Sequence, residues 1–257
     1  MSDPCSPADA DQCIAGLEAE LAAAHAEMQA FTATVSHELR APLRHITSFA
    51  QLLQEEAGPA LGMEAQEFLG HITGSAKHLA QMLDALLALS RVGTVPLHLQ
   101  SVALGEVLAV LVQERVRDLQ VRQPERTMRW MLATNLPAVQ ADASLLTAAL
   151  AQLLDNAIKF TAQRADAAID INASVDATTG AVHCTIRDNG VGFKADLAAK
   201  LFQPFIRLHS SSQFVGLGMG LALARKSLAR MGGAIAISAT VDGGCSVTVV
   251  LPLSQVD

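Results

Sequence analysis

The sequence has few basic residues, few cysteines and no long apolar run. It carries 18 lysines and arginines against 25 aspartates and glutamates, a formal net charge of −7. That balance disfavours a protein that binds nucleic acids in general or anionic membrane surfaces, because both kinds of binding need a concentrated basic surface. The four cysteines (Cys5, Cys13, Cys184 and Cys245) are too scattered for a disulfide framework and form no CxxC pair. This cysteine usage is typical of a reducing, cytoplasmic setting.

The longest stretch without a charge, Leu208 to Ala224, is broken by serines and glycines. A membrane-spanning helix needs roughly 20 predominantly apolar residues, so we expect no span in this chain. The first residues, MSDPCSPADADQC, contain acids where a secretion signal would carry bases. With 51% hydrophobic and 17% charged residues over 257 positions, wholesale disorder is excluded and one large or two ordinary domains are expected.

The first third of the chain has the periodicity of two long helices. From Ile14 to about Glu56, apolar residues recur in alternating steps of three and four, which is a heptad seam. Gly58 and Pro59 mark a turn, and a second helix with the same spacing ends near residues 91–93. One hairpin has little core, so we expect two copies to pair as a dimeric four-helix bundle. A coiled-coil spacer without chemistry has the same periodicity and stays an alternative at this point.

Beyond Pro96 the pattern changes to short strands alternating with helices. Strands are expected at 97–102, 127–132, 167–175, 181–187, 234–239 and 246–251, and helices near 104–120, 143–160 and 219–231. This mixture predicts a two-layer α/β sandwich. The whole chain is therefore predicted to be α+β, with a tail and coiled-coil lead-in at 1–30, the long helical hairpin at 31–93 and the sandwich at 97–257.

A histidine stands in the run SHELRAPLR on the first helix. With Val35 and Leu39 on the apolar seam, His37 lies about 200° away around the helix and projects outward. An exposed imidazole beside the carboxylate of Glu38 can act as base, ligand or nucleophile. On helix geometry alone, an ordinary surface histidine is the simpler interpretation.

A polar cluster lies in the expected helix 143–160. Gln152, Asn156 and Lys159 are spaced four and three residues apart and share one face. Amide oxygens suit a hard cation and an ammonium suits phosphate oxygens, so this face fits a metal–phosphate group. Taken alone, a solvated polar face explains the spacing more simply.

Two further segments follow the fourth expected strand. In DNGVGF, Asp188 with Gly190 and Gly192 forms either an ordinary tight turn or a loop that admits a flat ligand and accepts its amine proton. The run LFQPFIR then offers the aromatic side chain of Phe205 and the cation of Arg207.

A glycine-rich run, GLGMGL, opens the last expected helix. Gly216, Gly218 and Gly220, followed by Leu221, leave N–H groups available at a helix N-terminus, which suits phosphates. The run is neither a Walker A loop nor GxGxxG. Each of these signals is weak by itself.

The order of the motifs is far more specific than any one of them. His37, Asn156, Asp188, Phe202 and Gly216 stand in segments that resemble the H, N, G1, F and G2 boxes of the two-component sensor histidine kinases. The stretches SHELRAPL, LLDNAIKFT, DNGVGF and GLGMGLALA carry most of the match, which extends over nearly the whole chain. LRAPLRHI and PFIRLHS look most like the group that includes the phytochrome-type kinases.

That resemblance implies a dimerisation and phosphotransfer hairpin joined to an ATP-binding domain of the Bergerat, or GHKL, fold. His37 would be the phosphoryl acceptor and Glu38 the acid or base that polarises its imidazole. The phosphoryl group would then pass to an aspartate on the receiver domain of a response regulator. The implied partners are a second copy of the chain, that regulator, and an upstream sensor domain or protein.

The same resemblance implies ATP and Mg²⁺ as cofactors. Asn156, with Gln152, would ligate the metal. The other implied nucleotide-binding residues are Lys159 and Arg207 for phosphates, Asp188 for the adenine amine, Gly190 and Gly192 for the shape of the adenine pocket, and Gly216, Gly218 and Gly220 for closure of a lid over the triphosphate. Phe205 and Leu221 are also implied to bind the nucleotide.

Three positions depart from the family pattern. Gln152 stands where an asparagine is usual, and the longer amide shifts the metal geometry. Ala41 replaces the Thr or Asn that orients water in phosphatase-competent members, so we expect weak or absent phosphatase activity. Leu217 replaces a frequent threonine, a loss we expect to be tolerated.

Two other functions share these features. A phosphotransfer scaffold whose ATP domain no longer binds nucleotide is favoured by Gln152 and disfavoured by Asn156 and Asp188. An ATPase of the same fold that drives a conformational change is disfavoured by His37 and Pro42, because such proteins have no helix of this kind.

Overall fold

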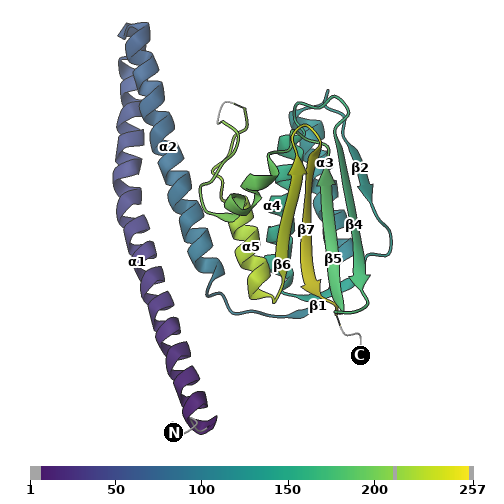
Figure 1. The fold of residues 1–257 in the computed structure, drawn as a ribbon. Coiled ribbons are helices and arrows are strands. Elements are labelled where there is room, and N and C mark those ends of the chain that lie inside the picture. Colours follow the sequence, from purple (N-terminus) through teal and green to yellow (C-terminus); the bar gives the residue numbers. More distant parts are fainter. Residues whose placement is uncertain (1–6, 211–212, 255–257) are drawn as a thin grey trace. The chain divides into compact units, whose positions relative to one another are not determined.

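The computed structural model describes residues 7–210 and 213–254, and the chain divides into two compact units, Met1–Arg91 and Val92–Asp257 (Figure 1). Residues 1–6 of the predicted tail, with Cys5, lie outside the described residues. Within the described part, none of the helices combines the length and apolar character needed to cross a bilayer.

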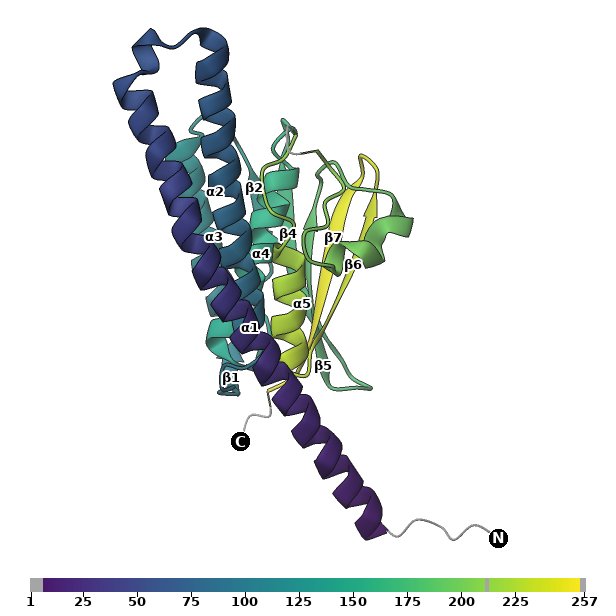
Figure 2. The ribbon, with the colours of Figure 1, turned by 90° about the vertical axis from the view of Figure 1, so that its left-hand side faces the viewer.

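The first unit is an antiparallel helical hairpin. Its elements are α1 (Pro7–Glu56), the 3₁₀ turn η1 (Gly58–Ala60) and α2 (Met63–Val92). The N-terminal part of α1 extends beyond α2 (Figure 2). A small apolar cluster of Leu43, Ala76 and Leu83 joins the two helices. The side chain of Arg40 donates to Asp84 across the hairpin at 2.6 Å, which helps to set the register of one helix against the other.

Much of the apolar seam of this hairpin stays exposed. The large apolar side chains with more than a third of their surface open to solvent include Leu39, Ile46, Phe49, Leu53, Phe68, Ile72, Leu79 and Leu86. The buried cluster of the hairpin is much smaller than this exposed set. The heptad pattern therefore specifies more apolar surface than one hairpin buries.

The second unit is a two-layer α/β sandwich. Its elements are β1 (Gln100–Ala103), α3 (Leu104–Arg122), β2 (Arg129–Leu132), β3 (Ala138–Ala141), α4 (Ala143–Phe160), β4 (Ala168–Asp176), β5 (Ala181–Asp188), η2 (Ala195–Phe202), α5 (Gly220–Arg230), β6 (Ala234–Thr240) and β7 (Gly244–Pro252). Five strands form one sheet in the order β2-β4-β5-β7-β6, in which only β2 and β4 are parallel. The helices α3, α4 and α5 cover one face of this sheet (Figures 1 and 2).

Helix α4 is the central element of the core. Its leucines, Leu146, Leu150, Leu153 and Leu154, are almost fully buried against the inward side chains of the sheet. Asp142 caps its N-terminus, because the Oδ1 atom accepts hydrogen bonds from the backbone N–H groups of Ser144 at 3.0 Å and Leu145 at 3.1 Å. A capped helix with one apolar face holds its opposite, polar face in a fixed orientation.

The predicted architecture of a helical hairpin followed by a two-layer sandwich is confirmed. The expected helix 143–160 coincides with α4, and the expected strands from 167 onward are all present. The expected strand at 97–102 begins only at Gln100. β3 was not predicted, because AVQA is too short to show alternation. It forms a separate two-stranded sheet with β1 and is also joined to Leu253 by an isolated antiparallel bridge at Val139. The 3₁₀ segment η2 was not predicted either.

Candidate functional site

The first candidate site is the exposed histidine of α1. The side chain of His37 is 82% exposed, as the helical phase predicts, and its Nδ1 lies 3.4 Å from Oε1 of Glu38. Pro42 lies inside the helix one turn later, and having no N–H it leaves the backbone carbonyl of Glu38 without its usual donor. One ring nitrogen of His37 is therefore engaged by a carboxylate while the ring faces solvent.

The second candidate site begins on the polar face of α4. A Cβ added at Gly220, the first residue of α5, would lie 2.7 Å from Oε1 of Gln152 and 3.7 Å from Nδ2 of Asn156. One turn further along α4, the Nζ of Lys159 would lie 3.5 Å from a Cβ added at Gly216. The structure thus brings the three polar residues of α4 against the glycine run that precedes α5.

The positive charges of Lys159 and Arg207 act on each other at this face. Burial lowers the pKa of Lys159, the positive charge of Arg207 lowers it further, and Asp155 acts in the opposite direction. The guanidinium of Arg207 donates to the backbone carbonyl of Phe214 at 2.6 Å. An anionic ligand beside Lys159 and Arg207 would relieve this repulsion.

Asp188 provides a buried acceptor at the end of β5. It is only 6% exposed, and its carboxylate accepts hydrogen bonds from the backbone N–H groups of Gly190, at 2.8 Å, and of Cys245 on β7. Burial raises the pKa of Asp188 to about 6, against the effect of these two donors. Two backbone donors do not exhaust the acceptor sites of a carboxylate, so Asp188 retains capacity for a ligand's amine.

The loop after Asp188 requires its two glycines. A Cβ at Gly190 would lie 2.6 Å from the carbonyl oxygen of Phe160, and one at Gly192 would overlap the carbonyl of Thr240. Gly192 also has a φ of +59°, in the left-handed region. Only glycine permits the loop to lie this close to the end of α4 on one side and to the β6–β7 turn on the other.

Phe205 and the glycine run are held together by their backbones. The N–H of Phe205 donates to the carbonyl of Gly218 at 3.1 Å, and Phe205 itself has a φ of +64°. Leu221, in contrast, is partly buried and packs against the core of the sandwich. The ring of Phe202 lies under the guanidinium of Arg225, 5.6 Å from it, and so belongs to the contact of η2 with α5.

A ring cluster against the loop that follows Asp188 was not identified from the sequence. The centroids of Phe160, His209 and Phe214 lie between 5.1 and 5.6 Å apart, and Nε2 of His209 is 3.2 Å from the carbonyl oxygen of Gly192. Lys159 Nζ lies 4.5 Å from the Phe160 centroid. Phe160 could have been assigned from its place directly after Lys159. No local pattern marks His209, which sits in a serine-containing loop.

The side chains of this site fit a metal ion only if a ligand shares it. Among the described residues, no three His, Cys, Asp or Glu side chains lie close enough together to hold a metal ion. Mg²⁺ usually binds through one or two protein oxygens together with substrate phosphates and water, so the amide oxygens of Gln152 and Asn156 fit a shared metal–phosphate site and not a closed cage.

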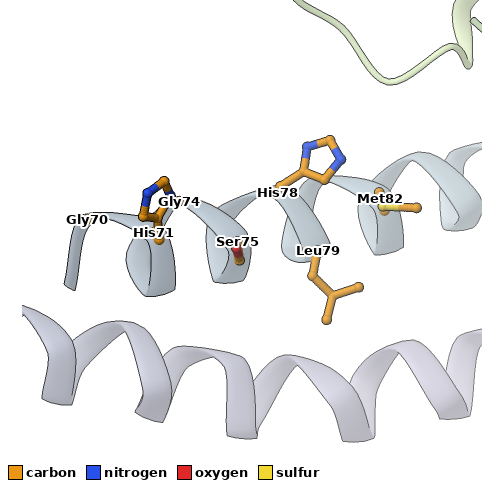
Figure 3. A pocket seen from close by; sticks show the side chains of 7 residues that line it. All are labelled: Gly70, His71, Gly74, Ser75, His78, Leu79 and Met82. Carbon is orange, nitrogen blue, oxygen red and sulfur yellow. The ribbon is translucent and has the colours of Figure 1, made fainter. Parts of the chain in front are cut away.

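A separate shallow groove runs along α2 (Figure 3). It is lined by Gly70, His71, Gly74, Ser75, His78, Leu79 and Met82. His71 and His78 lie two helical turns apart, a rise of roughly 10 Å, which is too far for both imidazoles to ligate one ion.

Comparison with known proteins places both units in families. Residues 27–94 match the family described as "His Kinase A (phospho-acceptor) domain". Residues 141–255 match the family described as "Histidine kinase-, DNA gyrase B-, and HSP90-like ATPase". The two matches follow each other in the order found in sensor kinases, so the resemblance stated above is confirmed. The chain belongs to the two-component sensor histidine kinases.

Several known proteins are similar to most of this chain. Cyanobacterial phytochrome B of a Nostoc species is 30% identical over 90% of this chain and 30% of its own length. The methanogenesis regulatory histidine kinase FilI of Methanothrix harundinacea is 31% identical over 91% of this chain and 25% of its own length. Full-length ShkA, solved in complex with AMPPNP, has a TM-score of 0.62 at 26% identity, covering 88% of this chain and 46% of the ShkA chain. The present chain thus spans about a quarter to a third of the length of these curated relatives.

Proposed function

We propose that this chain catalyses ATP-dependent phosphorylation of His37 and then passes the phosphoryl group to an aspartate on the receiver domain of a response regulator. The observation that carries the proposal is the exposed imidazole of His37, with Nδ1 at 3.4 Å from Glu38, in a chain that also holds the polar α4 site. An ordinary surface histidine needs no such second site.

The chemistry at His37 follows from its two ring nitrogens. With the proton on Nδ1 facing Glu38, the Nε2 lone pair is free to attack the γ-phosphorus of ATP, and the bond from that phosphorus to the bridging oxygen breaks, releasing ADP. The ring then carries a positive charge, which the Glu38 carboxylate offsets until it takes the Nδ1 proton. Phosphoryl transfer needs little covalent help beyond such positioning and charge neutralisation.

The residues of the sandwich would bind and orient the nucleotide. Asp188 accepts a hydrogen bond from the adenine amine, while Gly190 and Gly192 leave room for the flat base. Lys159 and Arg207 neutralise phosphate oxygens, which suits two cations whose charges act against each other.

The glycine run completes this nucleotide site. Gly216, Gly218 and Gly220 offer backbone N–H groups to the triphosphate. Phe205 holds the middle of the run through the carbonyl of Gly218, and Leu221 anchors its C-terminal end in the core. Mg²⁺ held by the amide oxygens of Asn156 and Gln152 would neutralise charge on the phosphate oxygens. All of these roles require that the sandwich binds a nucleotide, and nucleotide binding can be measured separately from the chemistry at His37.

The hairpin would dimerise this kinase. Its exposed apolar seam, which includes Phe49 and Leu53, is the surface expected to pair with a second copy as a four-helix bundle. In this proposal residues 1–30 form a lead-in that receives a signal from an upstream sensor domain or protein, 31–93 the phosphotransfer hairpin and 97–257 the ATP-binding domain. The scattered cysteines fit a cytoplasmic location.

The test is incubation of the full chain with γ-labelled ATP and Mg²⁺. We expect label that is acid-labile, alkali-stable and absent from His37→Gln. The control His71→Gln, which removes an exposed histidine of α2, should be labelled like the wild type. Label retained by His37→Gln contradicts the proposal. Absence of both label and ATP binding would favour the phosphotransfer scaffold instead.

A further inference from the structure

Arg164, in the turn between α4 and β4, forms hydrogen bonds with two segments that are distant from it in the sequence. Its Nη2 atom donates to two backbone carbonyls, that of Gly190 at 3.1 Å and that of Asp242 at 2.7 Å. The same nitrogen lies 3.5 Å from the Asp242 carboxylate. The side chain is only 30% exposed, and its bond to Gly190 is partly buried while its bond to Asp242 is exposed to water.

The two carbonyls belong to segments that must stay together for the Asp188 loop to keep its shape. Gly190 is in that loop, and Asp242 is at the tip of the β6–β7 turn with a φ of +59°. The N–H of Asp242 donates back to the carbonyl of Val191 at 2.8 Å. Arg164 therefore links three segments of the chain at one point.

Gly190 is held on both sides by this arrangement. Its N–H donates to Oδ1 of Asp188 at 2.8 Å, and its carbonyl accepts from Arg164. A glycine has no side chain to restrict its backbone, so without Arg164 it gains conformations in which its N–H no longer faces Asp188. The Asp188 carboxylate would then lose one of the two donors that fix its orientation.

We propose that Arg164 is a positioning residue for adenine recognition: by clamping Gly190 to the β6–β7 turn, it aims the remaining acceptor of Asp188 at the exocyclic amine. This inference rests on the proposed ATP site. It differs from a general stabilising role, because it predicts an effect confined to the base of the nucleotide.

Arg126 supplies a matched comparison. Its Nη2 donates to the carbonyl of Ile158 at 2.7 Å and to the hydroxyl of Thr161 at 3.1 Å, so it also ties a partly buried guanidinium to backbone near α4. Neither partner belongs to the Asp188 loop. Loss of Arg126 should weaken the fold without changing which base is preferred.

The test compares Mg²⁺-dependent binding of ATP and ITP by the full chain, using calorimetry and a thermal unfolding midpoint for each variant. ITP carries a carbonyl oxygen where adenine carries its amine. In Arg164→Gln we expect the Kd for ATP to rise about tenfold, the effect of one partly buried charged hydrogen bond, while the Kd for ITP changes less than about twofold. Arg164→Lys, which keeps a donor, should recover part of the preference.

Arg126→Gln should lower the unfolding midpoint and leave the ratio of the two Kd values unchanged. Suppose that the wild type prefers ATP and that Arg164→Gln keeps the full preference, or binds both nucleotides more weakly by the same factor. That result would overturn this inference and leave the proposed function standing. A wild type that binds neither nucleotide overturns the proposed function and this inference with it.

Discussion

The Nδ1 atom of His37 lies 3.4 Å from Oε1 of Glu38, its neighbour along α1. Both side chains are largely exposed, at 82% and 76%, so solvent screens the attraction between them. The contact therefore acts mainly through geometry: in the proposed mechanism it holds the proton on Nδ1 and leaves Nε2 as the nucleophile.

This contact predicts a specific loss in Glu38→Gln. The amide no longer takes the Nδ1 proton or offsets the charge on the phosphorylated ring, so the rate of His37 phosphorylation should fall by roughly 10²-fold. The Kd for ATP should be unchanged, because Glu38 is not in the sandwich. Single-turnover labelling at saturating ATP measures the first quantity and calorimetry the second. An unchanged labelling rate would remove Glu38 from the mechanism.

Asp188→Asn should raise the stability of the folded protein while impairing recognition of the adenine base. The pKa of Asp188 is raised to about 6 in the folded protein, against 3.8 for the free side chain, so the folded state binds the proton more tightly than the unfolded chain. The stability this carboxyl contributes is fully present below about pH 4 and is lost as pH rises through about 6. The asparagine variant should therefore be more stable than the wild type at pH 7.5, by about 1–3 kcal/mol, while losing the preference for ATP.

Denaturant unfolding of both proteins at pH 4.5 and pH 7.5 checks this sign. The difference in free energy of unfolding between Asp188→Asn and the wild type should be larger at pH 7.5 than at pH 4.5. A gap of the same size at both values would show that burial of the ionised carboxylate is not the cause.

Asp142→Ala should weaken the helix that carries Gln152, Asn156 and Lys159. Hydrogen bonds from the Ser144 hydroxyl, and then from the Leu145 and His98 N–H groups, lower the pKa of Asp142 to about 2. Loss of the cap should cost about 1–2 kcal/mol at pH 7. The wild-type advantage should be present above about pH 4 and decline as pH falls toward 2.

Asp155 on the same helix provides the control for Asp142. Its contact with Arg115, at 3.2 Å, is exposed, and Asp155→Ala should cost less than about 1 kcal/mol. Urea unfolding of both variants measures the difference. Equal costs would mean that the cap contributes no more than an exposed ion pair.

Gly192→Ala should abolish nucleotide binding and destabilise the sandwich, because the added methyl group overlaps the Thr240 carbonyl as well as adopting an unfavourable φ. Gly180→Ala is the matched control, since Gly180 has a similar φ of +65° with nothing within 4 Å of the added Cβ. The control measures only the loss of folding free energy, about 1 kcal/mol, that comes from placing alanine at a positive φ. Calorimetric ATP binding by Gly180→Ala should match the wild type, and similar losses in both variants would disprove the packing argument.

The sequence predicts those parts of the site whose residues stand close together along the chain. Gln152, Asn156 and Lys159 share a face because of their helical spacing alone, and Asp188 contacts the glycine two positions later. The apolar period of α4 predicts that helix from end to end. In each case the spacing of residues along the chain is sufficient to predict which side chains lie together.

The parts that were missed depend on distant partners. Arg164 binds Gly190 and Asp242, which are 26 and 78 positions away, and His209 reaches Gly192 across 17 positions. Such contacts exist only after the sheet has formed, and no local pattern records them. β3 escaped prediction for a similar reason, since four residues show no period until β1 pairs with them.

The most direct test of the central claim is identification of the phosphorylated atom. The wild-type chain is labelled with ATP and Mg²⁺, digested under alkaline conditions, and the phosphopeptide analysed by mass spectrometry and ³¹P NMR. The account predicts one phosphohistidine, at His37, with phosphorus bonded to Nε2. Phosphorus on Nδ1 of His37, on another histidine, or on a hydroxyl or carboxylate would contradict it.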